Sequence, residues 1–202
     1  MNVINSVGRF MWRFSTPSIA SVLNRSLGKY LPKGKKCYLS IVSDTPRIRS
    51  EIFETNNPWI KSARITIHAP SKKIFDILAN PYRHQDLDGS ATIRNALSGP
   101  NRLQLDSKFS MAMRLGINYR VTNTVVEFRE NEIIAWRHLG RWRWRYELTA
   151  ISADETLVTE TLDASKAPQI SKWWLTLRKA MPWTQMAVAK TLVNLKVLAE
   201  GK

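Results

Sequence analysis

The sequence predicts an α+β domain in which a curved antiparallel sheet holds a long C-terminal helix. Three observations support this fold class. Residues 63–163 run in the order strand, helix, short turn and then a series of strands; the turns between the later strands are short; and an apolar stripe at helical spacing ends the chain. Short hairpin connections favour an antiparallel meander. A sheet bent around a helix can leave apolar space between the two.

The first strand is predicted at residues 64–68, where Ile65 and Ile67 alternate with polar side chains. A helix is expected next, because Pro70 suits the first position of a helix and Asn80-Pro81 ends one. A second short helix is predicted at residues 82–87, and the turn at residues 88–90 ends it. The apolar face of the first helix has residues spaced three and four apart, namely Ile74, Ile77 and Leu78.

Six further strands are predicted from the alternation of apolar and polar side chains. The clearest cases are residues 107–115 and 141–148, where every second side chain is large and apolar. Turns that contain glycine or charged residues separate the segments. These segments are residues 91–97, 107–115, 119–128, 133–139, 141–148 and 156–163.

The C-terminal segment is predicted to be helical, with its apolar residues on one stripe and its lysines off that stripe. Pro182 has no backbone N–H, so we expect it to kink this segment or split it in two, with the main helix beginning near Pro182. Gln185 fills a missing step of the stripe, which otherwise comprises Trp174, Leu177, Met181, Val188, Leu192, Leu195 and Ala199.

Length and composition favour one domain at residues 60–202, preceded by a basic N-terminal extension or linker at residues 1–59. No stretch of about 18 consecutive apolar residues occurs, so no transmembrane helix is predicted. The single cysteine, Cys37, allows no internal disulfide and fits a reducing compartment. We expect a cytoplasmic location, with attachment to a membrane surface and organellar import as alternatives.

The first 43 residues contain no acidic side chain, and residues 3–14 place apolar residues at helical spacing. A short basic amphipathic helix is therefore predicted, ending at Thr16-Pro17. Three interpretations stay open: an arm that packs on the domain or remains disordered, a helix that lies on a membrane surface, and an organellar transit peptide.

The net charge of +15 is concentrated at the two ends of the chain. Residues 1–62 carry ten Lys and Arg against three Asp and Glu, residues 63–165 carry fourteen against twelve, and residues 166–202 carry seven against one. A basic end suits anionic lipid, nucleic acid or an acidic protein, and it also serves solubility alone. The partners we expect are a small hydrophobic ligand, an anionic membrane surface and, less favoured, nucleic acid.

Motifs that identify common enzyme classes are missing from the sequence. It contains no P-loop, no dinucleotide-binding glycine pattern, no His-Glu-x-x-His and no Gly-x-Ser-x-Gly. The histidines His68, His84 and His138 are far apart and lack metal-ligand spacing. We therefore predict no cofactor and no metal, and a role other than catalysis is favoured.

Large apolar side chains on one face of the predicted strands are the candidates for a ligand site. Alternation sends them toward the helix, and Met and Trp suit an adaptable apolar pocket. Core packing is the simpler role for any one of them. His138 and Tyr119 are the expected polar anchors, although a buried histidine with its own partner is the simpler interpretation of His138. The predicted ligand-binding residues are Phe109, Met111, Met113, Tyr119, Trp136, His138, Trp142, Trp144 and Tyr146.

A catalytic alternative depends on three titratable residues, His84, Asp86 and His138. Together they can supply an acid and a base, as the cyclisation of a polyketone requires. The loop that carries His84 and Asp86 is polar in any case, so an ordinary loop is the simpler interpretation.

Arginines alternate with tryptophans at residues 141–145. Arginine beside aromatic residues is typical of single-stranded nucleic-acid binding. A period of two sends Arg141, Arg143 and Arg145 to the face opposite the tryptophans, so the two kinds of side chain cannot form one stacking platform. We expect a solvated outer face. A basic module associated with nucleic acid or the ribosome stays as an alternative that rests on the two ends of the chain.

Residues 69–81, 136–148, 158–161 and 191–200 together resemble the SRPBCC superfamily. This is the START-like, helix-grip group that includes polyketide cyclase/dehydrase-type proteins. The resemblance rests on the order of the elements and covers residues 60–202. It implies a seven-stranded antiparallel sheet wrapped around a long C-terminal helix, two short helices between the first two strands, and a hydrophobic cavity.

Members of that group include binders, transfer proteins and cyclases, so the resemblance implies no particular reaction. The function we expect is the binding or carrying of a small hydrophobic ligand, such as a lipid, polyketide or isoprenoid, in an internal cavity. A cyclase- or dehydratase-like enzyme that uses the same cavity is the first alternative, and the nucleic-acid module is the second.

Overall fold

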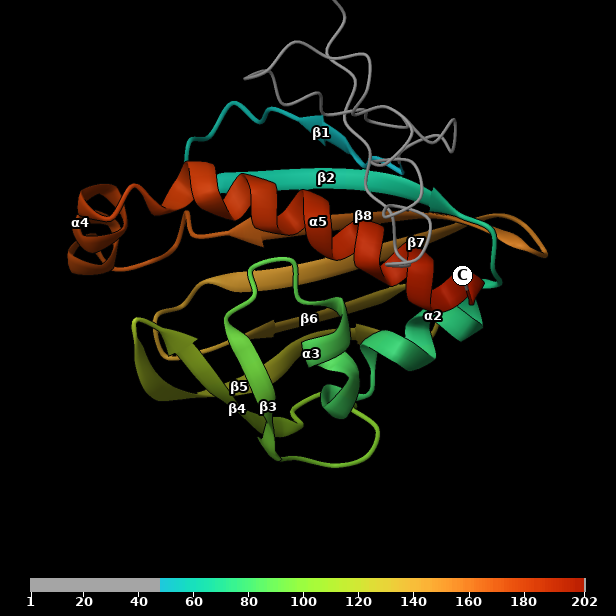
Figure 1. Ribbon diagram of the computed structural model, residues 1–202, viewed down its shortest axis with the longest axis horizontal. Helices are drawn as coiled ribbons and strands as arrows, with labels where there is room; N and C mark the ends of the chain where they lie inside the picture. The colour runs from blue at the N-terminus through green and yellow to red at the C-terminus, as the bar shows by residue number, and fades with distance from the viewer. Residues whose placement is uncertain (1–47, 202) are drawn as a thin grey trace, which may run out of the picture. The chain divides into compact units, whose positions relative to one another are not determined.

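The computed structural model describes residues 48–201, which form one antiparallel sheet with helices against its concave face (Figure 1). The amphipathic helix predicted at residues 3–14 lies outside the described residues. The α+β class, the antiparallel sheet and the long C-terminal helix are confirmed.

Within residues 48–201 eight strands pair in the order β1-β2-β8-β7-β6-β5-β4-β3. Every pair is antiparallel, and the first strand of the predicted meander, β2, pairs with the last, β8. The first and last strands of the predicted meander therefore lie side by side within the sheet, and β1 and β3 form its two edges. The strands are β1 (Glu51–Phe53), β2 (Ile60–Ile67), β3 (Ile93–Ser98), β4 (Lys108–Leu115), β5 (Ile117–Arg129), β6 (Ile133–Arg137), β7 (Arg143–Ser152) and β8 (Glu155–Asp163).

The sheet has one strand more than the seven that the resemblance implies. The additional strand, β1, precedes the domain boundary expected near residue 59 and pairs with β2. An ion pair between Glu51 and Arg64, 2.8 Å long, links the two strands. Three residues are too few to show the alternation by which a strand is recognised in a sequence.

Two short helices lie between β2 and β3, as expected: α2 (Ser71–Leu78) and α3 (His84–Leu87), the latter preceded by a 3₁₀ turn, η1 (Pro81–Arg83). Pro70 stands immediately before α2, and its C=O accepts hydrogen bonds from the N–H groups of Lys73 and Ile74. The apolar face of α2 is buried. These helices close the concave face on the side of α5 away from β2 (Figure 1).

The C-terminal segment is split into α4 (Gln169–Leu177) and α5 (Ala180–Glu200). Between them Lys179 adopts a left-handed conformation with φ of 48°. Pro182 is the third residue of α5, where a backbone N–H has no partner within the helix. The expected split is confirmed, but it interrupts the predicted stripe. Trp174 and Leu177 are exposed, whereas Met181 of the same predicted stripe is buried, because the break turns α4 away from α5.

Helix α5 is held from both sides by hydrogen bonds to its surroundings. On one side, Gln185 donates to the C=O of Ser62 over 3.0 Å and Lys196 donates to the C=O of Thr66 over 2.7 Å. On the other side, the N–H of Gly89 donates to Oγ1 of Thr191 over 2.9 Å.

Between these contacts Val188, Leu192 and Leu195 are fully buried in the core. Within residues 48–201 no helix has both the length and the apolar character needed to cross a membrane.

Gly89 should be intolerant of a side chain because α5 approaches it closely. A Cβ on Gly89 would lie 2.3 Å from the O of Ala187 and 2.4 Å from the N of Thr191, and helix backbone cannot yield as a flexible side chain can. We expect Gly89→Ala to lower the free energy of unfolding by about 3 kcal/mol, the upper range for overpacking. Urea unfolding followed by tryptophan fluorescence measures it.

Gly116→Ala is the matched control. Gly116 has φ of 78° but no atom within 4 Å of the added Cβ, so this variant should show only the backbone term, about 1 kcal/mol. Equal losses in the two variants would contradict a tight contact between the loop at Gly89 and α5.

Candidate functional site

The inner face of the sheet, formed by every second residue and directed toward α5, is buried in its middle and becomes more exposed where β4 ends and β7 begins. Along β4, Phe109 and Met111 are buried, Met113 is half-buried and Leu115 is exposed. Along β7, Tyr146 and Leu148 are buried, Trp144 near its start is half-buried, and the last four residues are exposed. We call this the open end: the β4–β5 turn and the β6–β7 turn, residues 115–117 and 138–142.

Four of the nine predicted ligand-binding side chains are buried in the middle of the inner face, and three of them form an aromatic cluster with His84. His84 stacks on Trp136 with ring centroids 4.7 Å apart, and Tyr146 lies 5.4 Å from Trp136. Phe109 packs edge-on against both His84 and Trp136, at 5.4 and 5.7 Å. Phe109, Met111, Trp136 and Tyr146 are buried in the hydrophobic core, and their role in ligand binding stays a prediction.

A polar pair lies beside this cluster with no access to solvent. The hydroxyl of Tyr146 donates to Oε1 of Glu160 over 2.8 Å, and Glu160 is fully buried. Oε2 of Glu160 has no hydrogen-bond partner among the described residues. Burial raises the pKa of Glu160 well above its usual range, although the hydrogen bond from Tyr146 opposes the change. Burial also raises the pKa of Tyr146. The pair therefore favours its protonated, neutral form.

Asp88 places a negative charge near this pair. Its carboxylate accepts hydrogen bonds from the backbone N–H groups of Ser90, Thr92 and Ile93, at 2.9, 2.8 and 2.8 Å, and so shapes the loop after α3. After burial, the charge of Asp88 is a further cause of the raised pKa of Glu160 and of Tyr119. The surrounding charge therefore keeps these groups as hydrogen-bond donors.

Tyr119 and His138, the predicted anchors, both lie near the open end. Tyr119 is 39% exposed. Strand β6 ends two residues earlier than predicted, so His138 belongs to the following turn, where its Nδ1 accepts from the N–H of Gly140 over 2.9 Å. The His138 ring packs edge-on against Trp142, and burial lowers the pKa of His138. The role of both residues in ligand binding stays a prediction.

The predicted catalytic residues His84, Asp86 and His138 lie in three different surroundings. His84 is buried, and its Nε2 hydrogen-bonds with the C=O of Leu78 over 2.8 Å. Because a carbonyl only accepts, Nε2 carries the proton. Burial lowers the pKa of His84 to about 4. Asp86 is exposed and pairs with Arg83 at 2.7 Å. Among the described residues, no hydrogen bond or ion pair joins any two of the three.

The arginines of β7 lie on the outer face of the sheet, as expected. Arg145 is 3.0 Å from Oε2 of Glu127 and 2.6 Å from Oε2 of Glu147, and Arg143 also pairs with Glu127. Acidic neighbours balance these charges, which leaves this face little attraction for a phosphate backbone.

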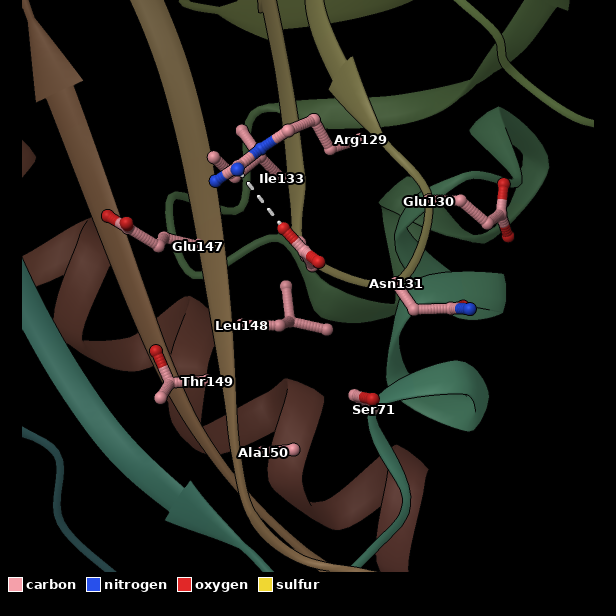
Figure 2. A pocket seen from close by; sticks show the side chains of 10 residues that line it. Ser71, Arg129, Glu130, Asn131, Ile133, Glu147, Leu148, Thr149 and Ala150 are labelled. Atoms are coloured by element: carbon pink, nitrogen blue, oxygen red, sulfur yellow. Dashed lines mark ion pairs between the residues drawn. The ribbon is translucent and has the colours of Figure 1, made fainter.

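A pocket of about 550 Å³ lies away from the predicted ligand-binding residues, at the β5–β6 turn and the start of α2 (Figure 2). Arg129 and Glu132 form an ion pair of 3.2 Å beside it, and Oδ1 of Asn131 is buried without a partner in the described part of the chain. This charged lining suits a polar molecule better than an apolar one. The lining comprises Ser71, Arg129, Glu130, Asn131, Glu132, Ile133, Glu147, Leu148, Thr149 and Ala150.

Glu160 is the residue that sequence reasoning missed. Its signal was present, because Thr156, Val158, Glu160 and Leu162 alternate with the more exposed residues of β8. That alternation places an acidic side chain among inward-facing ones, where an unpaired charge is costly. A carboxyl group at such a position is a candidate functional group.

No family model matches the chain. The chain is 34% identical to the uncharacterized protein Rv0088 of Mycobacterium tuberculosis over 170 residues, which cover 81% of this chain and 73% of that protein.

Among solved structures, protein Ms6760 of Mycobacterium smegmatis is similar with a TM-score of 0.56 and 10% identity, over 76% of this chain and 99% of that one. The Polyketide_cyc-like protein Cgl2372 of Corynebacterium glutamicum is similar with a TM-score of 0.51 and 13% identity, over 72% and 94%. At these identities the similarity concerns the fold.

The depressed pKa of His84 should make the protein less stable in acid. Unfolded chains bind a proton at this position below about pH 6.5, whereas the folded protein does so only below about pH 4. Stability is therefore lost as the pH falls through this interval, by up to about 3 kcal/mol. We expect H84Q to lack this loss when urea unfolding is measured from pH 7 to pH 4. The control H68Q removes a histidine that is exposed, so that any loss specific to the buried position is seen by comparison.

The raised pKa of Glu160 should act in the opposite direction. The folded protein keeps a proton that the unfolded chain releases above about pH 4.5, so stability falls as the pH rises from there toward the folded-state pKa. Relative to E160Q, the wild-type protein should lose up to about 1.4 kcal/mol per pH unit in that range. Parallel stability curves for wild type and E160Q would show that Glu160 ionises as freely in the folded protein as in the unfolded chain.

Proposed function

This chain belongs to the family of Rv0088, and we propose that it is a member of the SRPBCC superfamily of START-like helix-grip proteins, whose fold it shares, and that it binds or carries a small hydrophobic molecule on the inner face of its sheet. The observation that carries this proposal is the buried pair of Tyr146 and Glu160, with Oε2 of Glu160 unpartnered among the described residues.

The buried pair supports a ligand anchor because it is costly for folding alone. An unpartnered polar atom in an apolar interior costs about 1–3 kcal/mol, and apolar side chains of similar size would remove that cost. A neutral carboxyl group can both donate and accept a hydrogen bond. Glu160 is thus suited to a hydroxyl or carbonyl group on an otherwise apolar guest.

The open end supports the proposed route of entry. Met113, Tyr119 and Trp144 border it, and all three keep part of their surface in contact with solvent. Methionine adapts its shape readily, which suits a site that receives guests of different outline. We infer a ligand with an apolar body and one terminal oxygen, a description that fits isoprenoids, lipids and polyketides.

A cyclase- or dehydratase-like activity is the second candidate, and the same pair favours it. Tyr146 and Glu160 both favour their protonated forms, so together they can serve as a general acid toward a bound carbonyl oxygen. This candidate differs from the predicted set of His84, Asp86 and His138. If the pair is catalytic, the variant E160Q should still bind a polyketone but should no longer convert it to product. Mass spectrometry of the product measures this conversion.

Ligand binding can be tested with N-phenyl-1-naphthylamine, a neutral apolar probe that becomes fluorescent out of water. We expect the full chain to bind it, and M113W to bind it at least tenfold more weakly, because the larger side chain obstructs the open end. I151W is the control, since Ile151 is exposed on β7 near the turn to β8, at the opposite end of the sheet. Absence of probe binding, together with a native mass spectrum free of any co-purified molecule, would refute the proposal.

The anchor needs a separate test, for which the double variant Y146F/E160L is designed. It removes both polar partners at once, so neither is left buried alone. We expect it to bind N-phenyl-1-naphthylamine as the wild type does, while losing the preference of the wild type for hexadecanol over hexadecane in competition. An unchanged preference would exclude Tyr146 and Glu160 as the anchor.

A further inference from the structure

Helix α4 turns its apolar stripe away from the protein. Ile170, Trp173, Trp174 and Leu177 follow the spacing i, i+3, i+4, i+7, which places them on one face of a helix. Their exposed fractions are 70%, 60%, 42% and 65%. Only Leu175 of α4 is buried, and it lies on the opposite side of the helix. An amphipathic helix with its apolar face in solvent lacks the partner for which that face is suited.

The position of α4 leaves this stripe accessible within the described part of the chain. The helix lies beyond the ends of the strands, at the left of Figure 1, and α5 follows it. On α5, Trp183 and Met186 are exposed one turn apart, with exposed fractions of 45% and 64%. The apolar surface of α4 is therefore not an isolated side chain, since the next helix also exposes large apolar residues.

The same end of the sheet carries further exposed apolar side chains. Asp163, the last residue of β8, pairs with Arg143, the first residue of β7. Arg143 in turn pairs with Arg137, the last residue of β6. The β6–β7 turn beyond them exposes Leu139 at 97%, and the β4–β5 turn exposes Ile117 at 75%. The register thus places both turns of the open end at the sheet end from which the chain leads into α4.

Cations accompany this apolar surface. Residues 164–199 contain no Asp or Glu. Lys166, Lys172, Arg178 and Lys179 flank or belong to α4, and none of them forms an ion pair with another described residue. Lys172 lies over the ring of Trp59 and Arg178 over the ring of Trp174, at 5.6 and 5.5 Å. The surface is therefore apolar at its centre and positively charged around it.

We propose that α4 docks this protein on an anionic lipid bilayer. Trp173 and Trp174 would lie at the headgroup level, where tryptophan is favoured, and Ile170 and Leu177 would reach the acyl boundary. Each lysine or arginine near an anionic surface adds to the attraction. A second copy of the chain suits this surface poorly, because it would bring the same cations into contact. Nucleic acid would use the charges but not Ile170 and Leu177.

This docking does not rest on the proposed ligand, because the stripe of α4 and its cations are independent of the buried pair at Glu160. The two proposals join in one respect: docking through α4 would bring the open end of the sheet close to the bilayer. A lipid-like guest would then have a short path between membrane and inner face. Failure of either proposal leaves the other to be judged by its own measurement.

The test labels Leu177→Cys with the fluorophore NBD in the full chain, with Cys37→Ser removing the native thiol. On addition of vesicles of 70% phosphatidylcholine and 30% phosphatidylglycerol at low salt, we expect blue-shifted emission at least twice as intense. Salt at about 0.5 M should reverse most of the change. The matched control carries NBD at Ile151→Cys, another exposed apolar position, and should not respond.

Three outcomes would overturn the proposal. The first is an NBD signal at position 177 that vesicles leave unchanged. The second is an equal response to vesicles of pure phosphatidylcholine, which would exclude recognition of anionic lipid. The third is blue-shifted emission without vesicles that increases with protein concentration, which would show that a second copy covers α4.

A cosedimentation assay complements the probe. The unlabelled double variant W173S/L177S should bind the anionic vesicles at least tenfold more weakly than wild type. Both side chains are exposed and contribute little to the core, so the variant should fold. Unchanged binding by this variant would also count against docking through α4, since it would assign vesicle binding to another part of the chain.

Discussion

The structure depends on one close contact, the approach of α5 to the loop at Gly89. The Gly89 N–H bonds to Thr191, and no Cβ fits between the two backbones. On its other side α5 is fixed to β2 through Gln185 and Lys196. Because the helix is held on both sides, the sheet has to bend around it, and the inner face becomes an enclosed surface. The aromatic cluster and the pair at Glu160 lie on that surface.

Enclosure changes the chemistry of the polar groups that it traps. His84 stays neutral because a charged imidazole is poorly solvated there, and Glu160 favours its proton for the same reason. The two shifts have opposite effects on stability between about pH 4.5 and pH 6.5. A core of this kind keeps hydrogen-bond donors rather than charges beside apolar surface, which suits recognition of an uncharged molecule that carries one oxygen.

Much of the fold could be predicted from the sequence, because each strand from β4 to β8 has enough residues to show its alternation. β1 could not, because three residues show no period. The exposed stripe of α4 was missed for a geometric reason. In the sequence, Trp174 and Leu177 have the spacing that continues the stripe of α5, and only the left-handed conformation of Lys179 separates the two helices. Of the candidate site, alternation identified the inward-facing residues but not which of them contact one another. Glu160 was overlooked because a carboxyl group contradicts the usual reading of a buried position.

The joint between α4 and α5 has one more consequence. Lysine at a left-handed position costs about 1 kcal/mol more than glycine would, yet glycine would let the joint sample many angles. Because a lysine backbone is more restricted than that of glycine, Lys179 limits the angle between α4 and α5, so that α4 keeps one direction relative to the rest of the domain. A helix held in one direction would set the orientation of the domain relative to the surface that α4 contacts, as well as its distance from that surface.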